Sequence, residues 1–552
     1  MNPIRFDIGI LGGRIVDGAG NPWYYGDLGI AGKKISKIGR IDRKECQNVV
    51  RADDLYVCPG FIDIHTHSDV SALLYPGCDS TIRQGVTTHL VGNCGQSAAP
   101  VRGPYADLWR EHYWFSGFGY LKDWDWESFG QYLSHMEKKG VGHNIAGLVG
   151  HGTVRAMVLG SSQAAPTPKE LRLMKSLVDE SMRDGAFGLS TGLVYPPGCY
   201  AKTDEIIEMC KVVAKYGGIY TSHIRGERET VLDAIKEAVL IGEKSGVSVQ
   251  ISHNCPKVGA WGRTKETLRL AEEARIEGLD VTVDNDVHTD LEESMSASLP
   301  QYLHAIDKQE LFEILKDPGN RRRIKKEIIE DEHPGAGYVG LLKHGMFDRI
   351  FLMEVPRQKD LEGKTVAQVA EERRRDPYET FFDLILEEKD KIVTLYDYIL
   401  EEDVKALLVH PLVMVSSDGS TRSIDHVAGD SPGYSPCAFG EYPGIFERYV
   451  RDEAVLTIQE AVRKMTSFPA QRLGLLDRGL LRPGMRADIA VIDLARIRDR
   501  ATNLWPHAYP YKNYPPKYPE GIPHVIVNGT VAVKDGKQTK ARAGEVLRHK
   551  WP

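Results

Sequence analysis

Residues 57–67 read VCPGFIDIHTH, an apolar run that ends in two histidines separated by a single threonine. Seven more short runs rich in β-forming residues follow it, and each ends in polar or glycine-rich residues. Helical periodicity between such runs is typical of a parallel α/β sheet, and eight βα units close most simply into a barrel. The eight runs span residues 57–67, 87–94, 144–151, 186–192, 218–223, 247–253, 279–284 and 412–418.

The stretches between the runs carry helix signals of their own. After the fifth run, Leu232, Ile235 and Val239 fall on one helical face, and Gly246 stands where a C-terminal cap is expected. The interval between the seventh and eighth runs is far longer than an ordinary connection and is rich in charge. We therefore expect an inserted subdomain at about residues 287–400.

The two ends of the chain differ from its middle. Residues 5–57 alternate short strands with turns, and residues 482–537 repeat this style. A chain that leaves a small β unit, builds a barrel and returns places both ends in one sandwich. The predicted organisation is a β-sandwich from residues 1–57 and 482–552 that flanks a TIM-type (β/α)8 barrel at 58–481.

Composition limits the classes of function. The 552 residues are 42% hydrophobic and 27% charged, which suits a large globular core. The net charge of −7, with no basic face, argues against nucleic acid as a partner. No segment reaches the roughly 18 to 20 apolar residues of a membrane span, and the first residues lack the layout of a signal peptide. We expect a cytoplasmic protein that acts on a small molecule without membrane contact; a homo-oligomer is left open.

Metal-binding residue types stand where these runs end. His65 and His67 lie two apart on one strand and therefore project from the same face. In a parallel barrel, the carboxyl ends of all strands meet at a single rim, where active sites of such barrels are built. The other residues at these ends are Cys94, which ends the second run, His223, which ends the fifth, His253, which ends the sixth, and Asp418, which ends the eighth. Their convergence predicts a metal site.

The types of ligand indicate zinc. Thiolate and imidazole groups favour zinc over magnesium or calcium, which prefer oxygen. Three protein ligands would leave a position for water, whose pKa would fall toward about 7. If Asp418 faces that water, it could accept the proton and pass it to a leaving nitrogen.

Three further residues near the rim are candidates for substrate binding. His151 stands at the end of the third run and could contact a substrate oxygen or, equally, hydrogen-bond to another site residue. Tyr195 and Arg225 stand beside the ends of the fourth and fifth runs, where they could hold a polar or anionic group. Their alternatives are ordinary packing and pairing with carboxylates.

These motifs resemble those of the amidohydrolase superfamily. The resemblance begins with residues 59–67, PGFIDIHTH, and with residues 481–490, LRPGMRADIA. Within that superfamily the chain resembles the N-acyl-D-amino-acid deacylases, or D-aminoacylases. Residues 91–95, 150–155, 190–198, 222–227 and 416–419 carry this second resemblance, which covers nearly the whole chain.

The resemblance implies a division of the metal ligands. A tight zinc would be held by Cys94, His223 and His253, with the cysteine replacing the carboxylated lysine of many relatives. His65, His67 and Asp418 would frame a second, weaker metal position, and Asp418 would be the general acid/base. No lysine stands at the end of the fourth run, which agrees with this arrangement.

Three departures from the family pattern concern the substrate. Family members carry a His-Pro-Arg run whose arginine binds the substrate carboxylate, whereas this chain has Ser435-Pro436-Cys437. The usual tyrosine-containing loop after the seventh run is replaced by residues 284–288, DNDVH, which adds negative charge near the rim. The lysine beyond His253 is displaced to Lys257.

We therefore predict a zinc-dependent amide hydrolase that most closely fits deacylation of N-acyl-D-amino acids or related derivatives, by metal-hydroxide attack with Asp418 as acid and base. The missing arginine favours an alternative, a hydrolase of cyclic amides, carbamoyl groups or neutral amides. A third class, a non-catalytic binding protein on the same fold, is opposed by the complete set of ligands.

Overall fold

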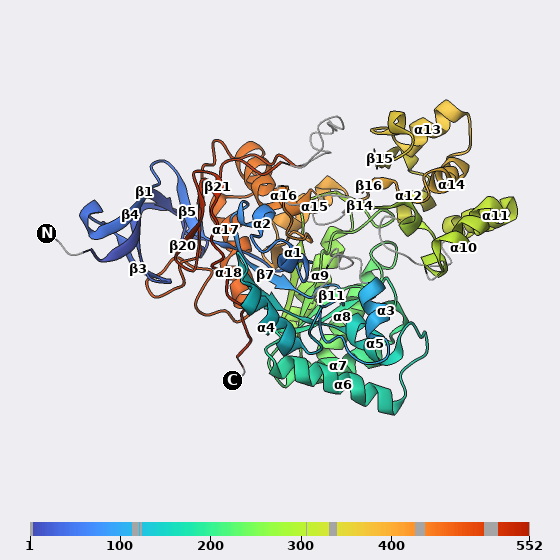
Figure 1. The fold of residues 1–552 in the computed structure, drawn as a ribbon, viewed down its shortest axis with the longest axis horizontal. Helices are drawn as coiled ribbons and strands as arrows, with labels where there is room; N and C mark the ends of the chain where they lie inside the picture. Colours follow the sequence, from blue (N-terminus) through green and yellow to red (C-terminus); the bar gives the residue numbers. More distant parts are fainter. Residues whose placement is uncertain are drawn as a thin grey trace.

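The computed structural model describes residues 4–112, 121, 124–304, 306–330, 339–424, 436–501 and 517–550. Within these residues, eight parallel segments form the central barrel (Figure 1). They are β6 (Phe61–Asp63), β7 (Val86–Val91), β8 (Asn144–Gly147) continued by β9 (Val149–Gly150), β10 (Gly188–Gly192), β11 (Ile219–His223), β12 (Ser248–Ile251), β13 (Val281–Asn285) and β17 (Val413–Val415). Each of the eight predicted runs overlaps one of these segments, so the barrel prediction is confirmed.

The barrel closes in two hydrogen-bonded groups of strands. One group is β6-β7-β8 and the other runs from β9 through β10, β11, β12 and β13 to β17. Leu148 stands between β8 and β9, and a parallel bridge between Thr66 and Gly419 joins the first strand region to the last. Every residue of β7 and β13 is buried, as expected when helices cover a parallel sheet.

Helices surround the barrel. They are α1 (Ser71–Leu74), α2 (Asp79–Ile82), α3 (Ala106–His112), α4 (Phe129–Lys139), α5 (His151–Leu159), α6 (Pro168–Arg183), α7 (Thr203–Ala214), α8 (Val231–Ser245), α9 (Thr264–Ile276), α15 (Glu401–Leu408), α16 (Cys437–Gly444), α17 (Ile458–Met465) and α18 (Ser467–Arg472). The prediction for α8 is confirmed: Ile235 is fully buried, and Gly246 caps the helix in the left-handed region. None of the described helices combines the length and the apolar composition needed to cross a bilayer.

Strands from both ends of the chain share one sheet. Its order among the described residues is β21-β20-β19-β18-β5-β1-β2-β3, with β4 also paired to β1. Figure 1 shows the blue N-terminal strands beside the red C-terminal ones at one end of the molecule. The strands are β1 (Phe6–Ile15), β2 (Tyr24–Ala31), β3 (Lys34–Gly39), β4 (Cys46–Arg51), β5 (Tyr56–Pro59), β18 (Ile489–Ile492), β19 (His524–Val527), β20 (Thr530–Lys534) and β21 (Lys537–Gln538). The sheet encloses its own apolar core, to which Ile10, Ile30, Ile489 and Ile526 contribute.

The first predicted run divides between the two units. β5 pairs antiparallel with β18 in the terminal sheet, and β6 pairs with β7 in the barrel. Gly60 lies at the junction, where a Cβ atom would come 2.2 Å from the Thr87 side chain. A residue without a side chain is therefore required where the chain passes from one unit to the other.

The residues between β13 and β17 include a second, antiparallel sheet with its own helices, coloured from green to orange-yellow in Figure 1 and set apart from the terminal sheet. Its antiparallel strands have the order β14-β16-β15. The elements are β14 (Asp290–Ser294), α10 (Lys308–Lys316), α11 (Pro318–Glu330), α12 (Val339–Lys343), β15 (Ile350–Glu354), α13 (Val366–Arg373), α14 (Pro377–Glu387) and β16 (Val393–Asp397). The residues just after β16 return to the barrel, where Tyr398 accepts a hydrogen bond from Val258 N and Ile399 forms a bridge with Lys257.

Candidate metal centre

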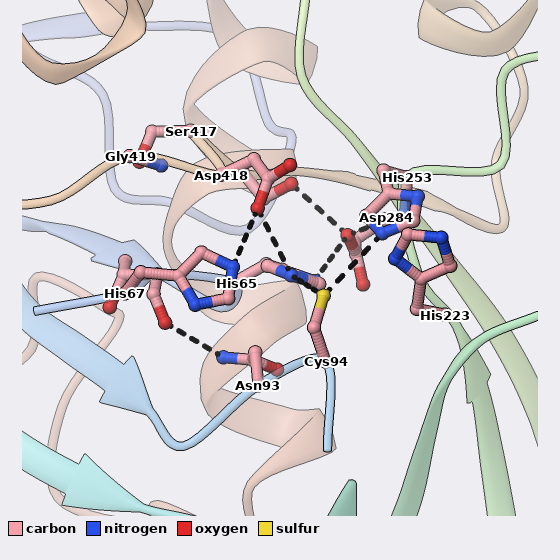
Figure 2. A network of polar contacts seen from close by, with 12 residues as sticks. His65, His67, Asn93, Cys94, His223, His253, Asp284, Ser417, Asp418 and Gly419 are labelled. Atoms are coloured by element: carbon pink, nitrogen blue, oxygen red, sulfur yellow. Dashed lines mark hydrogen bonds and ion pairs between the residues drawn. The ribbon is translucent and has the colours of Figure 1, made fainter. Parts of the chain in front are cut away.

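The six predicted metal ligands lie together at the carboxyl ends of the barrel strands (Figure 2). They form two groups that share one thiol. The ligand atoms within each group all lie within 4.8 Å of one another. One group is Cys94, His223 and His253; the other is His65, His67, Cys94 and Asp418.

The group of Cys94, His223 and His253 fits a zinc ion by distance as well as by chemistry. Tetrahedral zinc with a Zn–S bond of about 2.3 Å and a Zn–N bond of about 2.05 Å separates the sulfur from the nitrogen by about 3.6 Å. The distance from Cys94 Sγ to His253 Nε2 is 3.6 Å. All three side chains are buried or nearly so, and thiolate with imidazole is a donor set that zinc prefers.

The second group brings a carboxylate to the same place. Asp418 Oδ1 lies 3.0 Å from His67 Nε2 and 3.3 Å from His65 Nε2, and His65 Nε2 lies 3.2 Å from Cys94 Sγ. The Asp418 side chain is 31% exposed, whereas the His65 side chain is fully buried. Asp418 is therefore the residue of this group that a substrate could most readily reach.

Uncommon backbone conformations direct three of these side chains to the rim. Cys94, His253 and Asp418 have φ values of 50°, 33° and 51°, in a region that non-glycine residues seldom adopt. Hydrogen bonds hold each one: the hydroxyl of Tyr195 donates to Cys94 O, and the amides of His253 and Asp418 donate to Asp284 Oδ1 and His65 O. Such strain persists only where the surroundings over-determine it, which is common at functional sites.

Two buried carboxylates that the sequence analysis gave no role stand behind the ligand rings. Asp284 Oδ1 lies 3.3 Å from His65 Nδ1 and accepts hydrogen bonds from His253 N and Ser416 Oγ. Glu227 lies against His223 and His253. The sequence places the negative charge of Asp284 near the rim, and the structure adds that this residue is fully buried against His65. The position of Asp284 at the end of the seventh run is the sequence signal that could have indicated a role in the site.

The histidines of the site lower the pKa values of the neighbouring thiol and carboxyl groups. Burial raises the pKa of Cys94, but the charge on His65 and the hydrogen bonds from His223 and His253 outweigh burial and hold it well below its usual value. Burial likewise raises the pKa of Asp418, and its two histidine neighbours reverse the effect. A lowered pKa keeps both groups deprotonated, and a metal cation binds the deprotonated thiolate and carboxylate.

The predicted substrate residues His151 and Tyr195 both have partners within the protein, and their contact with a substrate stays a prediction. His151 is fully buried, and its Nε2 pairs with Glu205 Oε1 at 2.9 Å. Tyr195 supports Cys94 through its hydroxyl, and its ring packs edge-on against His223.

Arg225 has the carboxylate partner that the sequence analysis gave as the alternative to substrate binding. Its guanidinium donates to Glu237 at 2.9 Å and to the carbonyl oxygens of Cys199 and Ala201. These bonds occupy nearly all of its N–H groups, because an arginine has only five. The side chain therefore ties the loop after β10 to α8 (Val231–Ser245), and its contact with a substrate stays a prediction.

The residues that depart from the family pattern differ in where the structure places them. Ser435 lies outside the described residues, while Cys437 begins α16 and is buried. Lys257 is buried, with its Nζ 4.0 Å from Glu227 Oε1 and 5.0 Å from the centre of the Tyr398 ring. Asp286 is half-buried just beyond β13.

Comparison with known proteins agrees with this geometry. The sequence model of the amidohydrolase family matches residues 48–235 and 344–533, more than half of the chain. The chain belongs to the amidohydrolase family. Among curated proteins, this amidohydrolase is 31% identical to a D-aminoacylase of Alcaligenes xylosoxydans xylosoxydans, with 98% of this chain and 97% of the relative covered. It is 30% identical to an N-acyl-D-glutamate deacylase of the same organism, over 99% and 97%.

Solved structures show the same relationship. An N-acyl-D-glutamate deacylase from Bordetella bronchiseptica, complexed with zinc and a phosphonate inhibitor, has a TM-score of 0.77 and 28% identity over 99% of this amidohydrolase and 100% of that chain. A D-aminoacylase with a binuclear metal centre matches with the same score, identity and coverage. The zinc in the first of these structures agrees with the zinc interpretation of the donor set, and the binuclear centre of the second agrees with two groups of ligands.

Proposed function

We propose that this amidohydrolase is a zinc-dependent deacylase of N-acyl-D-amino acids or related derivatives. The observation that carries the proposal is the meeting of Cys94, His223 and His253 with the partly exposed carboxylate of Asp418 at one rim. The full-length similarity to D-aminoacylase supports the same substrate class.

The residues divide the chemistry between them. Cys94, His223 and His253 would hold a zinc ion, which would supply Lewis acidity toward a water molecule and a substrate carbonyl. Asp418 accepts the proton of the attacking water and delivers it to the nitrogen of the leaving amine, so that the C–N bond breaks without release of an unstable amide anion. The hydrogen bond from Tyr195 fixes the backbone that carries the thiolate. His65 and His67 hold Asp418 in place and frame a second, weaker metal position.

A second candidate, hydrolysis of cyclic, carbamoyl or otherwise neutral amides, is favoured by the changed residues around the site. Cys437 stands near the position where the family pattern has a carboxylate-binding arginine, and Arg225 is committed to Glu237. A substrate without a carboxylate would need neither the missing arginine nor Arg225.

A substrate screen separates the two candidates. N-acetylated D- and L-amino acids, dihydropyrimidine-type cyclic amides and uncharged N-acyl amines would be incubated with the zinc-loaded protein, and release of amine or ring opening would be measured. We expect turnover of the D-amino acid derivatives and little turnover of their L-enantiomers. Turnover restricted to cyclic or uncharged amides would replace the leading proposal with the second.

We also propose the remaining organisation from the sequence: a barrel at 58–481 with its insertion at about 287–400, and a cytoplasmic protein without nucleic-acid or membrane partners. The strand pairing of the terminal sheet and the antiparallel unit within the insertion support this division. Limited proteolysis is its direct test.

A further inference from the structure

The two zinc-binding imidazoles each have a nitrogen that faces away from Cys94. His253 presents Nε2 to the sulfur and turns Nδ1 outward, and His223 turns Nε2 outward. Both outward nitrogens are buried, and neither has a closely aligned hydrogen-bond partner among the described residues. A single carboxylate oxygen, Glu227 Oε1, lies 3.4 Å from the first and 3.6 Å from the second.

Glu227 is held where it can serve both rings. It stands four residues after His223 in the loop that follows β11 (Ile219–His223), and it is only 6% exposed. Its carbonyl oxygen accepts the amide hydrogen bond of Lys257, at 3.0 Å, which joins this loop to the one after β12 (Ser248–Ile251). The same lysine brings its Nζ to 4.0 Å from Glu227 Oε1.

Lys257 in turn is fixed by the end of the insertion. Its Nζ lies over the Tyr398 ring, and its backbone forms a bridge with Ile399. A buried carboxylate is costly unless a counter-charge lies near it, and Lys257 supplies this charge. A continuous path of contacts thus runs from the insertion through Lys257 and Glu227 to two ligands of the tight metal group.

The chemistry of imidazole gives this path a purpose. A histidine that binds a metal through one nitrogen carries its proton on the other, and a carboxylate that accepts this proton fixes both the tautomer and the ring orientation. We propose that Glu227 is the positioning residue for His223 and His253, and that Lys257 balances its charge. The inference rests on the zinc site of the proposed function and extends it to a residue that does not touch the ion.

Zinc affinity tests the inference independently of turnover. Purified wild type, Glu227→Gln and Glu227→Leu would be stripped of metal and titrated with zinc against a competing chelator. We expect Glu227→Leu, which has no acceptor atom, to bind zinc about 10 to 100 times more weakly. Glu227→Gln keeps an acceptor oxygen and should lie between the leucine variant and wild type.

The cobalt-substituted forms add a readout of ligand geometry. Because ligand-field bands report on the arrangement of the donors, we expect them to shift in Glu227→Leu while the thiolate band of Cys94 remains. The matched control is Glu205→Gln, since Glu205 is equally buried and also pairs with a histidine, His151, but touches no metal ligand. This control should retain wild-type zinc affinity.

The outcomes separate the inference from the proposed function. Wild-type protein that binds no zinc would overturn both. Tight zinc binding by wild type, matched by Glu227→Leu with an unchanged cobalt spectrum, would overturn only the role of Glu227. An equal loss of affinity in Glu205→Gln would also overturn it, because the effect would then follow from any buried glutamate.

Discussion

Replacing Asp418 with asparagine should separate catalysis from metal binding. Asn keeps the size of the side chain but cannot accept the proton of the attacking water. Positioned acid–base groups contribute about 10²- to 10⁴-fold to rate, or about 2.7 to 5.5 kcal/mol of barrier. Asp418 belongs to the group with His65 and His67 and not to the group of Cys94, His223 and His253. We therefore expect kcat to fall by that factor, while zinc bound per chain stays near the wild-type value.

The assay measures amine released from an N-acetyl-D-amino acid by the zinc-loaded variant, with metal content and thermal unfolding recorded on the same sample. Loss of zinc together with loss of activity would assign Asp418 a structural role at the centre. Turnover within about threefold of wild type, with zinc still bound, would refute the acid–base reasoning, because that reasoning asks Asp418 for at least about 100-fold.

Three further predictions concern the metal, a loop and pH. Removal of zinc by a chelator should abolish turnover and lower the melting temperature, and added zinc should restore both. The melting temperature should fall because a ligand at 1,000 times its Kd stabilises the folded state by about 4 kcal/mol. An apo protein with full activity would contradict the metal assignment. Arg225→Lys should lower the free energy of unfolding by about 1 to 3 kcal/mol and leave KM within about threefold. The reason is that the guanidinium binds Glu237 and two carbonyl groups. An unchanged melting temperature with a large rise in KM would instead support a contact between Arg225 and the substrate. Hydrogen bonds from Lys175 and Lys211 lower the pKa of Glu208 from 4.5 to about 2, so its contribution to stability is complete above pH 4.5 and is lost as pH falls toward 2. Because the side chains of Lys175 and Glu208 are each a third exposed, Glu208→Gln should lower the free energy of unfolding by less than about 1 kcal/mol at pH 7. The denaturation curves of variant and wild type should converge near pH 2.

Much of the barrel could be predicted because its strands lie in short runs rich in β-forming residues, and each run ends in polar or glycine-rich residues. The helix at 231–245 could be predicted from one apolar face and one glycine. The sheet of the insertion was not predicted, because β14 and β16 are almost 100 residues apart and their pairing leaves no local signal. The division of residues 57–67 at Gly60 was missed for a similar reason: the partner of β5 is β18, far along the chain.

The site divides in the same way. Position at a strand end was enough to predict that Cys94, His223 and His253 converge, because topology brings all such ends to one rim. It was not enough to give the direction of Arg225, whose partner Glu237 lies on a helix. It also gave no sign of Glu227, because two imidazoles meet it only in three dimensions.

The shared terminal sheet has a consequence for how the chain is made. β5 ends at Pro59, and its partner β18 begins at Ile489, about 430 residues later. At a synthesis rate of about 5 to 20 residues per second, one edge of the first strands stays unpaired for about 20 to 90 s while the ribosome completes the barrel. An open strand edge is prone to pair with other chains, so production of this protein should respond strongly to chaperone supply and to slower translation at low temperature.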